Sequence, residues 1–115
     1  MATVKLSLGL TENGTVNTPS ILTVPATGSS VKLLDGRYKY GSALVQNVGS
    51  NDICIRVDGI PTNAVYHVKL SPMSQAEINN AAYVDVSACG DAGASSAVVF
   101  NVQTGDSVVQ AATSY

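Results

Sequence analysis

Residues 44–59 have the sequence Leu-Val-Gln-Asn-Val-Gly-Ser-Asn-Asp-Ile-Cys-Ile-Arg-Val-Asp-Gly. Within this stretch, residues 53–57 alternate between a β-branched apolar side chain and Cys or Arg. A period of two is typical of a strand with one face in a core, because successive side chains point to opposite faces. A second strand is predicted over residues 42–48, and the turn-forming residues 49–52 separate the two. The pattern therefore predicts a hairpin here.

The same alternation recurs along the chain, bounded by Gly, Pro, Asn and Asp. Further strands are expected at residues 1–10, 21–24, 31–34, 65–70, 75–78, 83–87 and 97–102. The best candidate for a helix, residues 74–82, is short and contains one large apolar residue. The sequence therefore predicts an all-β fold, a single-domain antiparallel β-sandwich or jelly-roll-like barrel of about eight short strands.

Length and composition agree with one domain over residues 1–115. Apolar residues make up 45% of the chain and charged residues only 12%, so a core can form beneath a weakly charged surface. We expect residues 1–10 and 105–115 to act as arms in assembly, because an end strand can add to a neighbour's sheet. The start of the chain alternates and lacks a continuous apolar stretch, which predicts a protein made and kept in a cytoplasm.

Net charge and the length of apolar runs argue against two classes of partner. Six basic residues against eight acidic ones, with a net charge of −2, cannot form the positive surface that phosphate backbones require. No apolar run approaches the roughly 18 residues of a membrane span. We therefore expect no nucleic-acid partner and no membrane partner.

The sequence supplies little catalytic or metal-binding chemistry. The only histidine, His67, has no nucleophile or orienting acid near it in the sequence, so we expect no catalytic residue and no enzyme activity. Cys54 and Cys89 with His67 do not reach the four ligands of a structural zinc site, so no metal and no cofactor are expected. Both cysteines are predicted to be reduced, buried and small, with a disulfide between them as the alternative.

Residues 36–41 interleave basic and aromatic side chains. Two of the chain's five tyrosines fall here, and tyrosine gives a large contact area at low entropic cost. We therefore predict a protein interface at Arg37, Tyr38 and Tyr40. A solvated strand with bases on one face and tyrosines on the other is the structural alternative.

The middle of the chain resembles small accessory proteins of tailed-bacteriophage virions, of the capsid-decoration or head-fibre kind. The resemblance rests on the strand that ends in Asn47-Val-Gly49, on Pro61-Thr62, on the corner Leu70-Ser-Pro-Met-Ser74 and on the order of the strands that follow. Met73 stands where that pattern usually has glycine, so we expect the corner to bend differently.

This resemblance implies a β-sandwich that decorates or cements a capsid through protein contacts. The implied partners are the major capsid protein or another virion protein, and the implied state is a homo-oligomer, with a trimer favoured. The expected location is the virion. The alternative is a carbohydrate- or receptor-binding module of a virion fibre or cell surface, for which Tyr38, Tyr40 and Tyr66 are the available aromatic residues.

Overall fold

The computed structural model describes residues 15–105, which form nine β-strands and no helix. The strands are β1 (Thr15–Val16), β2 (Ser20–Val24), β3 (Val31–Leu34), β4 (Lys39–Asn47), β5 (Ile53–Val57), β6 (Val68–Leu70), β7 (Gln75–Ala82), β8 (Val86–Gly90) and β9 (Ser95–Gly105). The predicted all-β class is confirmed. Apart from Gly105, the predicted arms at 1–10 and 105–115 lie outside the described residues.

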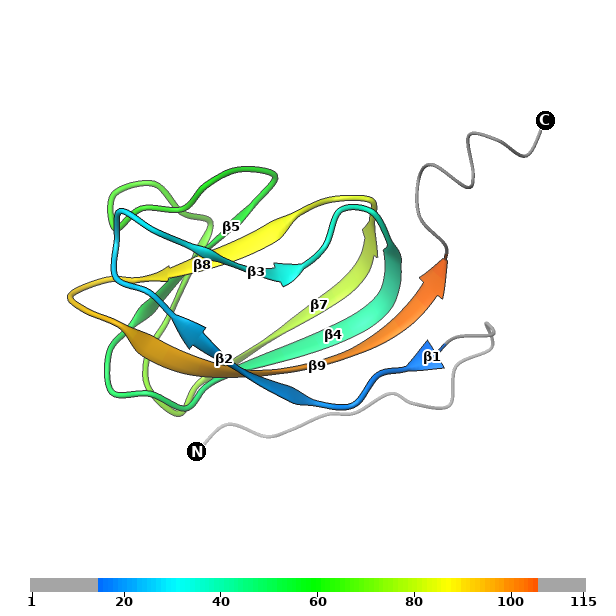
Figure 1. Ribbon diagram of the computed structural model, residues 1–115, viewed down its shortest axis with the longest axis horizontal. Helices are drawn as coiled ribbons and strands as arrows, with labels where there is room; N and C mark the ends of the chain where they lie inside the picture. Colours follow the sequence, from blue (N-terminus) through cyan, green and yellow to red (C-terminus); the bar gives the residue numbers. More distant parts are fainter. Residues whose placement is uncertain (1–14, 106–115) are drawn as a thin grey trace.

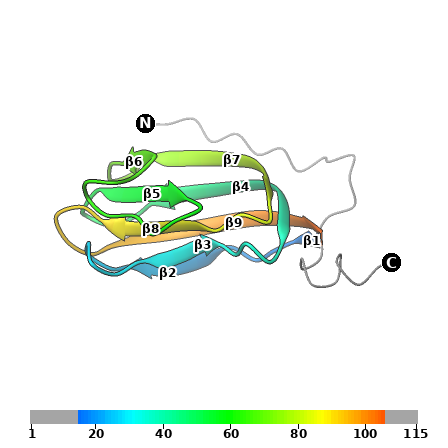
Figure 2. The same cartoon turned by 90° about the horizontal axis from the view of Figure 1, so that it is seen from above.

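The strands form two sheets that pack face to face as a β-sandwich (Figure 1). One sheet has five strands, with β1 and β2 beside β9, then β4, then β7 at the edge. The other has four strands in the order β3-β8-β5-β6. The edge strands β6 and β7 lie on the same side of the sandwich (Figure 2). The chain therefore crosses from one sheet to the other at several corners, among them those between β6 and β7 and between β7 and β8.

The core lies between the two sheets, where alternate side chains of each strand point inward. In β4, for example, Ala43, Val45 and Asn47 are buried while their neighbours are partly exposed. The inward apolar side chains with the least exposure include Val24, Leu34, Val45, Ile53, Val86, Ala88 and Ala97. Small and β-branched side chains predominate, which explains how the sequence fills this core with one Phe and no Trp.

The predicted hairpin at residues 49–52 is wrong. β4 belongs to the five-stranded sheet and β5 to the four-stranded sheet, so this turn connects the sheets. The side chain of Asn47 explains the change of direction, because it binds the backbone on both sides of the turn. Its Nδ2 donates to the carbonyl of Asn51 at 2.8 Å and its Oδ1 accepts from the N–H of Gly49 at 3.0 Å.

Several other predicted strands have different bounds, and three of these differences have a local explanation or add a new element length. The predicted strand 65–70 begins only at Val68, because the preceding residues belong to the β5–β6 connection. The piece at 75–78 extends through Ala82 as β7. The strand at 83–87 begins at Val86 instead, because Tyr83 has a φ of 58°, which takes the backbone out of the extended conformation.

At the corner between β6 and β7, Met73 adopts a backbone conformation that favours glycine. Met73 has a φ of 67°, the left-handed conformation that glycine adopts without steric cost. The corner is thus built with the dihedral that suits glycine. The N–H of Met73 donates to the carbonyl of Asn47 at 2.7 Å, which fixes the conformation.

We expect Met73→Gly to raise the free energy of unfolding by about 0.5 kcal/mol, because removing the left-handed strain outweighs the added freedom of the unfolded chain. The Met73 side chain is 66% exposed, so little packing is lost. Urea denaturation followed by circular dichroism measures the change. Met73→Ala is the matched control, which removes the same side chain but keeps the strain; an equal gain in both variants would contradict the explanation.

Candidate interaction surfaces

The structure separates the three residues of the predicted interface. Arg37 is exposed in the turn between β3 and β4, and Tyr38 is half-buried against the core. Tyr40 is only 6% exposed, because the pairing of β4 with β9 shifts register between Tyr40 and Ser42, which places residue 40 on the same inward face as Ala43 and Val45. The expectation of a tyrosine surface is therefore wrong for Tyr40, which is a core residue. The two rings pack edge to face, with 6.4 Å between their centroids.

Arg37 contributes instead to a charged hollow of about 400 Å³. The residues that line this hollow are Lys32, Asp35, Gly36, Arg37, Asp58, Tyr83 and Asp85. Asp58 and Tyr83 both have a positive φ, of 58° each, although neither is glycine. Backbone conformations of this kind concentrate at functional sites, where surrounding structure holds them in place.

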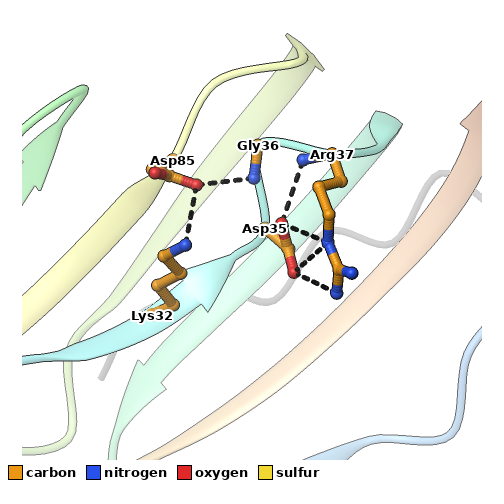
Figure 3. A network of polar contacts seen from close by, with 5 residues as sticks. All are labelled: Lys32, Asp35, Gly36, Arg37 and Asp85. Carbon is orange, nitrogen blue, oxygen red and sulfur yellow. Dashed lines mark hydrogen bonds and ion pairs between the residues drawn. The ribbon is translucent and has the colours of Figure 1, made fainter. Parts of the chain in front are cut away.

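Two separate carboxylates organise this hollow (Figure 3). The Oδ1 of Asp85 accepts a hydrogen bond of 2.6 Å from the N–H of Gly36 and lies 3.4 Å from the Nζ of Lys32. The carboxylate of Asp35 accepts from the Nε and the NH2 of Arg37, the latter at 2.9 Å. Arg37 also lies over the ring of Tyr38, 5.4 Å from its centroid. The charges in the hollow are therefore largely paired with one another.

The Arg37 guanidinium, through its hydrogen bonds, holds the pKa of Asp35 below the ordinary 3.8. We expect Arg37→Gln to move this pKa back toward 3.8, measured by NMR titration of the carboxyl carbon. Arg56→Gln is the control, because Arg56 donates to the carbonyl of Ile60 elsewhere. The stabilisation by this pair is present above pH 3.8 and is lost as the pH falls through the lowered pKa. An unchanged Asp35 pKa in Arg37→Gln would show that the guanidinium does not hold it.

A second candidate is the β5–β6 connection together with the strand residues at its two ends, which sequence analysis did not identify. Among the described residues, five of the nine exposed large apolar side chains belong to it. They are Val57 at 41%, Ile60 at 69%, Val65 at 49%, Tyr66 at 39% and Val68 at 43% exposed. We name these five residues the β5–β6 surface. A concentration of exposed apolar side chains is typical of a site that binds another protein.

Backbone hydrogen bonds hold this connection in one conformation. Thr62 and Val65 exchange N–H to carbonyl bonds of 2.9 and 3.2 Å, and the Thr62 hydroxyl accepts from the N–H groups of residues 64 and 65. The N–H of Asn63 donates to the hydroxyl of Thr27 across the sheet at 3.1 Å. Pro61 is fully buried and anchors the connection from below. The exposed apolar side chains therefore stand on a fixed support.

The structure gives His67 a role in this support. It lies just before β6, where its Nδ1 accepts a hydrogen bond of 3.1 Å from the N–H of Val57 and its own N–H donates to the carbonyl of Ile55. These bonds fasten the two ends of the β5–β6 connection together. Within residues 15–105, no group of three or more His, Cys, Asp or Glu is placed to hold a metal ion. That same range has no helix long and apolar enough to cross a membrane.

Cys54 in β5 and Cys89 in β8 are paired in register within the four-stranded sheet. Both are free thiols with no exposed surface, so the prediction of buried cysteines is confirmed. Burial raises the pKa of each thiol, and a hydrogen bond with Thr27 lowers that of Cys89 only in part. The thiols are therefore poor nucleophiles and act as small packing groups.

The sequence contained one signal for the β5–β6 surface. Its apolar residues interrupt a segment that also contains the turn formers Asp58, Gly59 and Pro61. Apolar residues inside a connection have no strand face to enter, so they are exposed unless something covers them. In comparisons with known proteins, no family model matches the chain and no curated protein matches it.

Proposed function

We propose that this protein is a non-enzymatic structural component of a phage particle that decorates or cements the capsid. It binds the major capsid protein or another virion protein as a homo-oligomer, with a trimer favoured. The observation that carries the proposal is the β5–β6 surface, a group of exposed apolar side chains on a rigid support. The residues that resemble tailed-phage accessory proteins give the proposal its context.

The rigidity of the β5–β6 connection bears on affinity. A loop that is ordered before binding loses less conformational entropy when it docks, so more of the contact energy appears as affinity. The surface is small for a stable interface of about 800 Å² per partner. Several copies joined in one oligomer compensate, because each additional contact becomes intramolecular once the first has formed. A decoration protein needs this arrangement.

Co-sedimentation with capsids purified from the phage that encodes the chain tests the proposal. We expect the double variant Ile60→Ser, Val65→Ser to bind at least tenfold more weakly, since burying each side chain contributes about 1.5 kcal/mol or more. Ile21→Ser is the matched control, because Ile21 is 75% exposed but lies on β2 in the other sheet. Equal binding by all three proteins would overturn the assignment of the surface, and no binding by the unmodified protein would overturn the proposed function.

The charged hollow favours a second candidate, a carbohydrate-binding module. Tyr83 is 38% exposed at its rim, and no hydrogen bond or ion pair is found for the Asp58 carboxylate within the described residues. An aromatic ring beside a free carboxylate is suited to the apolar face and the hydroxyls of a sugar. A glycan array tests this candidate. A hit that Tyr83→Ala abolishes would favour it, and no hit would leave the decoration role.

A further inference from the structure

Among residues 15–105 there are two Asp-Gly sequences, and the structure places them in opposite chemical situations. They are Asp35-Gly36, in the turn between β3 and β4, and Asp58-Gly59, in the β5–β6 connection. At an Asp-Gly sequence the backbone nitrogen of the glycine can attack the carboxyl carbon of the aspartate, because glycine has no Cβ to obstruct the approach. The carboxyl group and the N–H must both be free to move. Which of the two sequences reacts therefore depends on their hydrogen bonds.

Both reacting groups are held at Asp35-Gly36. The N–H of Gly36 donates to the Oδ1 of Asp85 at 2.6 Å. The carboxylate of Asp35 accepts from the backbone N–H of Arg37 at 2.9 Å and from the guanidinium of the same residue at 2.9 Å. Ring closure at this position would have to break these bonds, which involve charged groups and are therefore strong. The pairing within the charged hollow thus protects Asp35-Gly36.

Neither reacting group is held at Asp58-Gly59. Asp58 is exposed, and no hydrogen bond or ion pair is found for its carboxylate within the described residues. The same part of the chain provides no hydrogen-bond partner for the carbonyl of Asp58 or for the N–H of Gly59.

The bonds that fix this part of the connection lie on either side of that peptide group. Before it, the N–H of Asp58 donates to the carbonyl of Asp85 at 2.7 Å. After it, the guanidinium of Arg56 donates to the carbonyl of Ile60 at 3.1 Å. The peptide group between Asp58 and Gly59 is therefore the part of the connection that can rotate toward the carboxyl group.

We propose that Asp58-Gly59 is a site of spontaneous isomerisation to isoaspartate, which disables the adjacent β5–β6 surface. The nitrogen of Gly59 forms a bond to the Cγ of Asp58, and the hydroxyl group of the carboxyl leaves with the amide proton as water. The product is a succinimide. Water then adds to either of its carbonyl carbons and breaks the bond from that carbon to the nitrogen. Attack at Cγ restores aspartate, whereas attack at the α-carbonyl carbon leaves the chain connected through Cβ and Cγ.

The isomerised backbone does not fit the connection. It contains an additional carbon between Asp58 and Gly59, while the residues on both sides are fixed. The N–H of Asp58 is bound to Asp85, and Pro61 is fully buried. The extra length is therefore taken up by Gly59 and Ile60, and Ile60 is the most exposed member of the β5–β6 surface, at 69%. Displacement of Ile60 removes the ordering before binding that supports affinity.

Peptide mapping of aged protein tests the assignment. The full chain is incubated for several weeks at neutral pH, and trypsin then releases the two sites on separate peptides, residues 33–37 and 57–69. We expect isoaspartate at position 58 to exceed that at position 35 by about tenfold or more, because hydrogen bonds to charged groups hold Asp35-Gly36. In urea, which releases both sites, the two positions should react at similar rates. Equal accumulation in the folded protein, no isoaspartate at position 58, or the same ratio in urea would overturn the inference.

Gly59→Ala tests whether the nitrogen of residue 59 is the nucleophile. The added methyl group hinders attack by this nitrogen. The nearest atoms that it would meet belong to the guanidinium of Arg56, at 2.6 Å for Nε, and this flexible group can move aside. We expect isoaspartate at position 58 to fall severalfold, while the amount at position 35 stays unchanged. A fall at both positions or at neither would contradict the mechanism.

The effect on the β5–β6 surface rests on the proposed function and has a separate readout. Partly aged protein is co-sedimented with a limiting amount of capsids, and the bound and unbound fractions are mapped separately. We expect isoaspartate at position 58 to be concentrated in the unbound fraction, with position 35 as the internal reference. Equal content in both fractions would overturn the effect on the surface. Failure of fresh protein to bind capsids would overturn the proposed function, while the mapping would still decide the modification site.

Discussion

Asn47→Leu is expected to lower the free energy of unfolding by about 4 kcal/mol, because it leaves several buried polar groups without partners at about 1–3 kcal/mol each. Asn47 has no exposed surface, and its amide makes four hydrogen bonds. Its Nδ2 donates to the carbonyls of Asn51 and Leu70, and its Oδ1 accepts from the N–H of Gly49 and the hydroxyl of Ser95. Leucine has a similar size but no amide, so the expected loss of stability comes from the unpaired polar groups and not from lost packing.

Guanidinium denaturation followed by tyrosine fluorescence measures this loss at one fixed protein concentration. Asn63→Leu is the matched control: Asn63 is exposed, and only its backbone N–H is used, to bind Thr27. The control should change the free energy of unfolding by less than about 0.5 kcal/mol. If Asn47→Leu also stayed within about 1 kcal/mol of the unmodified protein, water or a shifted backbone would have to satisfy the four groups, and the amide would not hold the corner.

Much of the fold followed from the period-two pattern. In β5, Ile53 and Ile55 entered the core as predicted, whereas Val57, on the same predicted face, is 41% exposed. In β9, Ala97 and Val99 are the residues in the core, while Val98 and Phe100 are only partly buried. β7 was predicted only in part, since Gln75-Ala-Glu-Ile-Asn-Asn-Ala-Ala82 has one large apolar residue to mark its inner face. Its strand conformation comes from pairing with β4, a tertiary contact that local sequence does not encode.

Which sheet a strand joins was the property that the sequence did not reveal. Residues 49–52 have hairpin chemistry, yet they connect two sheets because the Asn47 amide binds Leu70 and Ser95 on other strands. The sequence did not predict the candidate surfaces correctly, for a similar reason. The position of Tyr40 depended on the register shift between Tyr40 and Ser42 in the pairing of β4 with β9, and the exposure of Ile60 depended on Pro61 anchoring the connection below it. Both depend on contacts between residues distant in sequence.

The Asn-x-Gly phrase that carries the resemblance to phage accessory proteins has a physical basis in this structure. Asn47 supplies the amide that joins the corner, and Gly49 lets β9 approach it closely. A Cβ at position 49 would lie 2.1 Å from the Oγ of Ser95 and 2.5 Å from the backbone nitrogen of Ser96. The Ser95 hydroxyl cannot turn away without losing its bond to Asn47. The two residues therefore work as one unit.

Gly49→Ala is consequently expected to lower the free energy of unfolding by about 3 kcal/mol, at the upper end of overpacking, because the obstructing atoms include backbone held by strand pairing. Gly93→Ala is the matched control, since its Cβ would approach only the flexible Asn51 amide, at 3.1 Å, and it should cost less than about 1 kcal/mol. Adding Gly49→Ala to Asn47→Leu should cost less than the sum of the two single effects, because each disturbs the same contact with Ser95. Fully additive losses in denaturation experiments would mean that the amide and the glycine stabilise the corner independently.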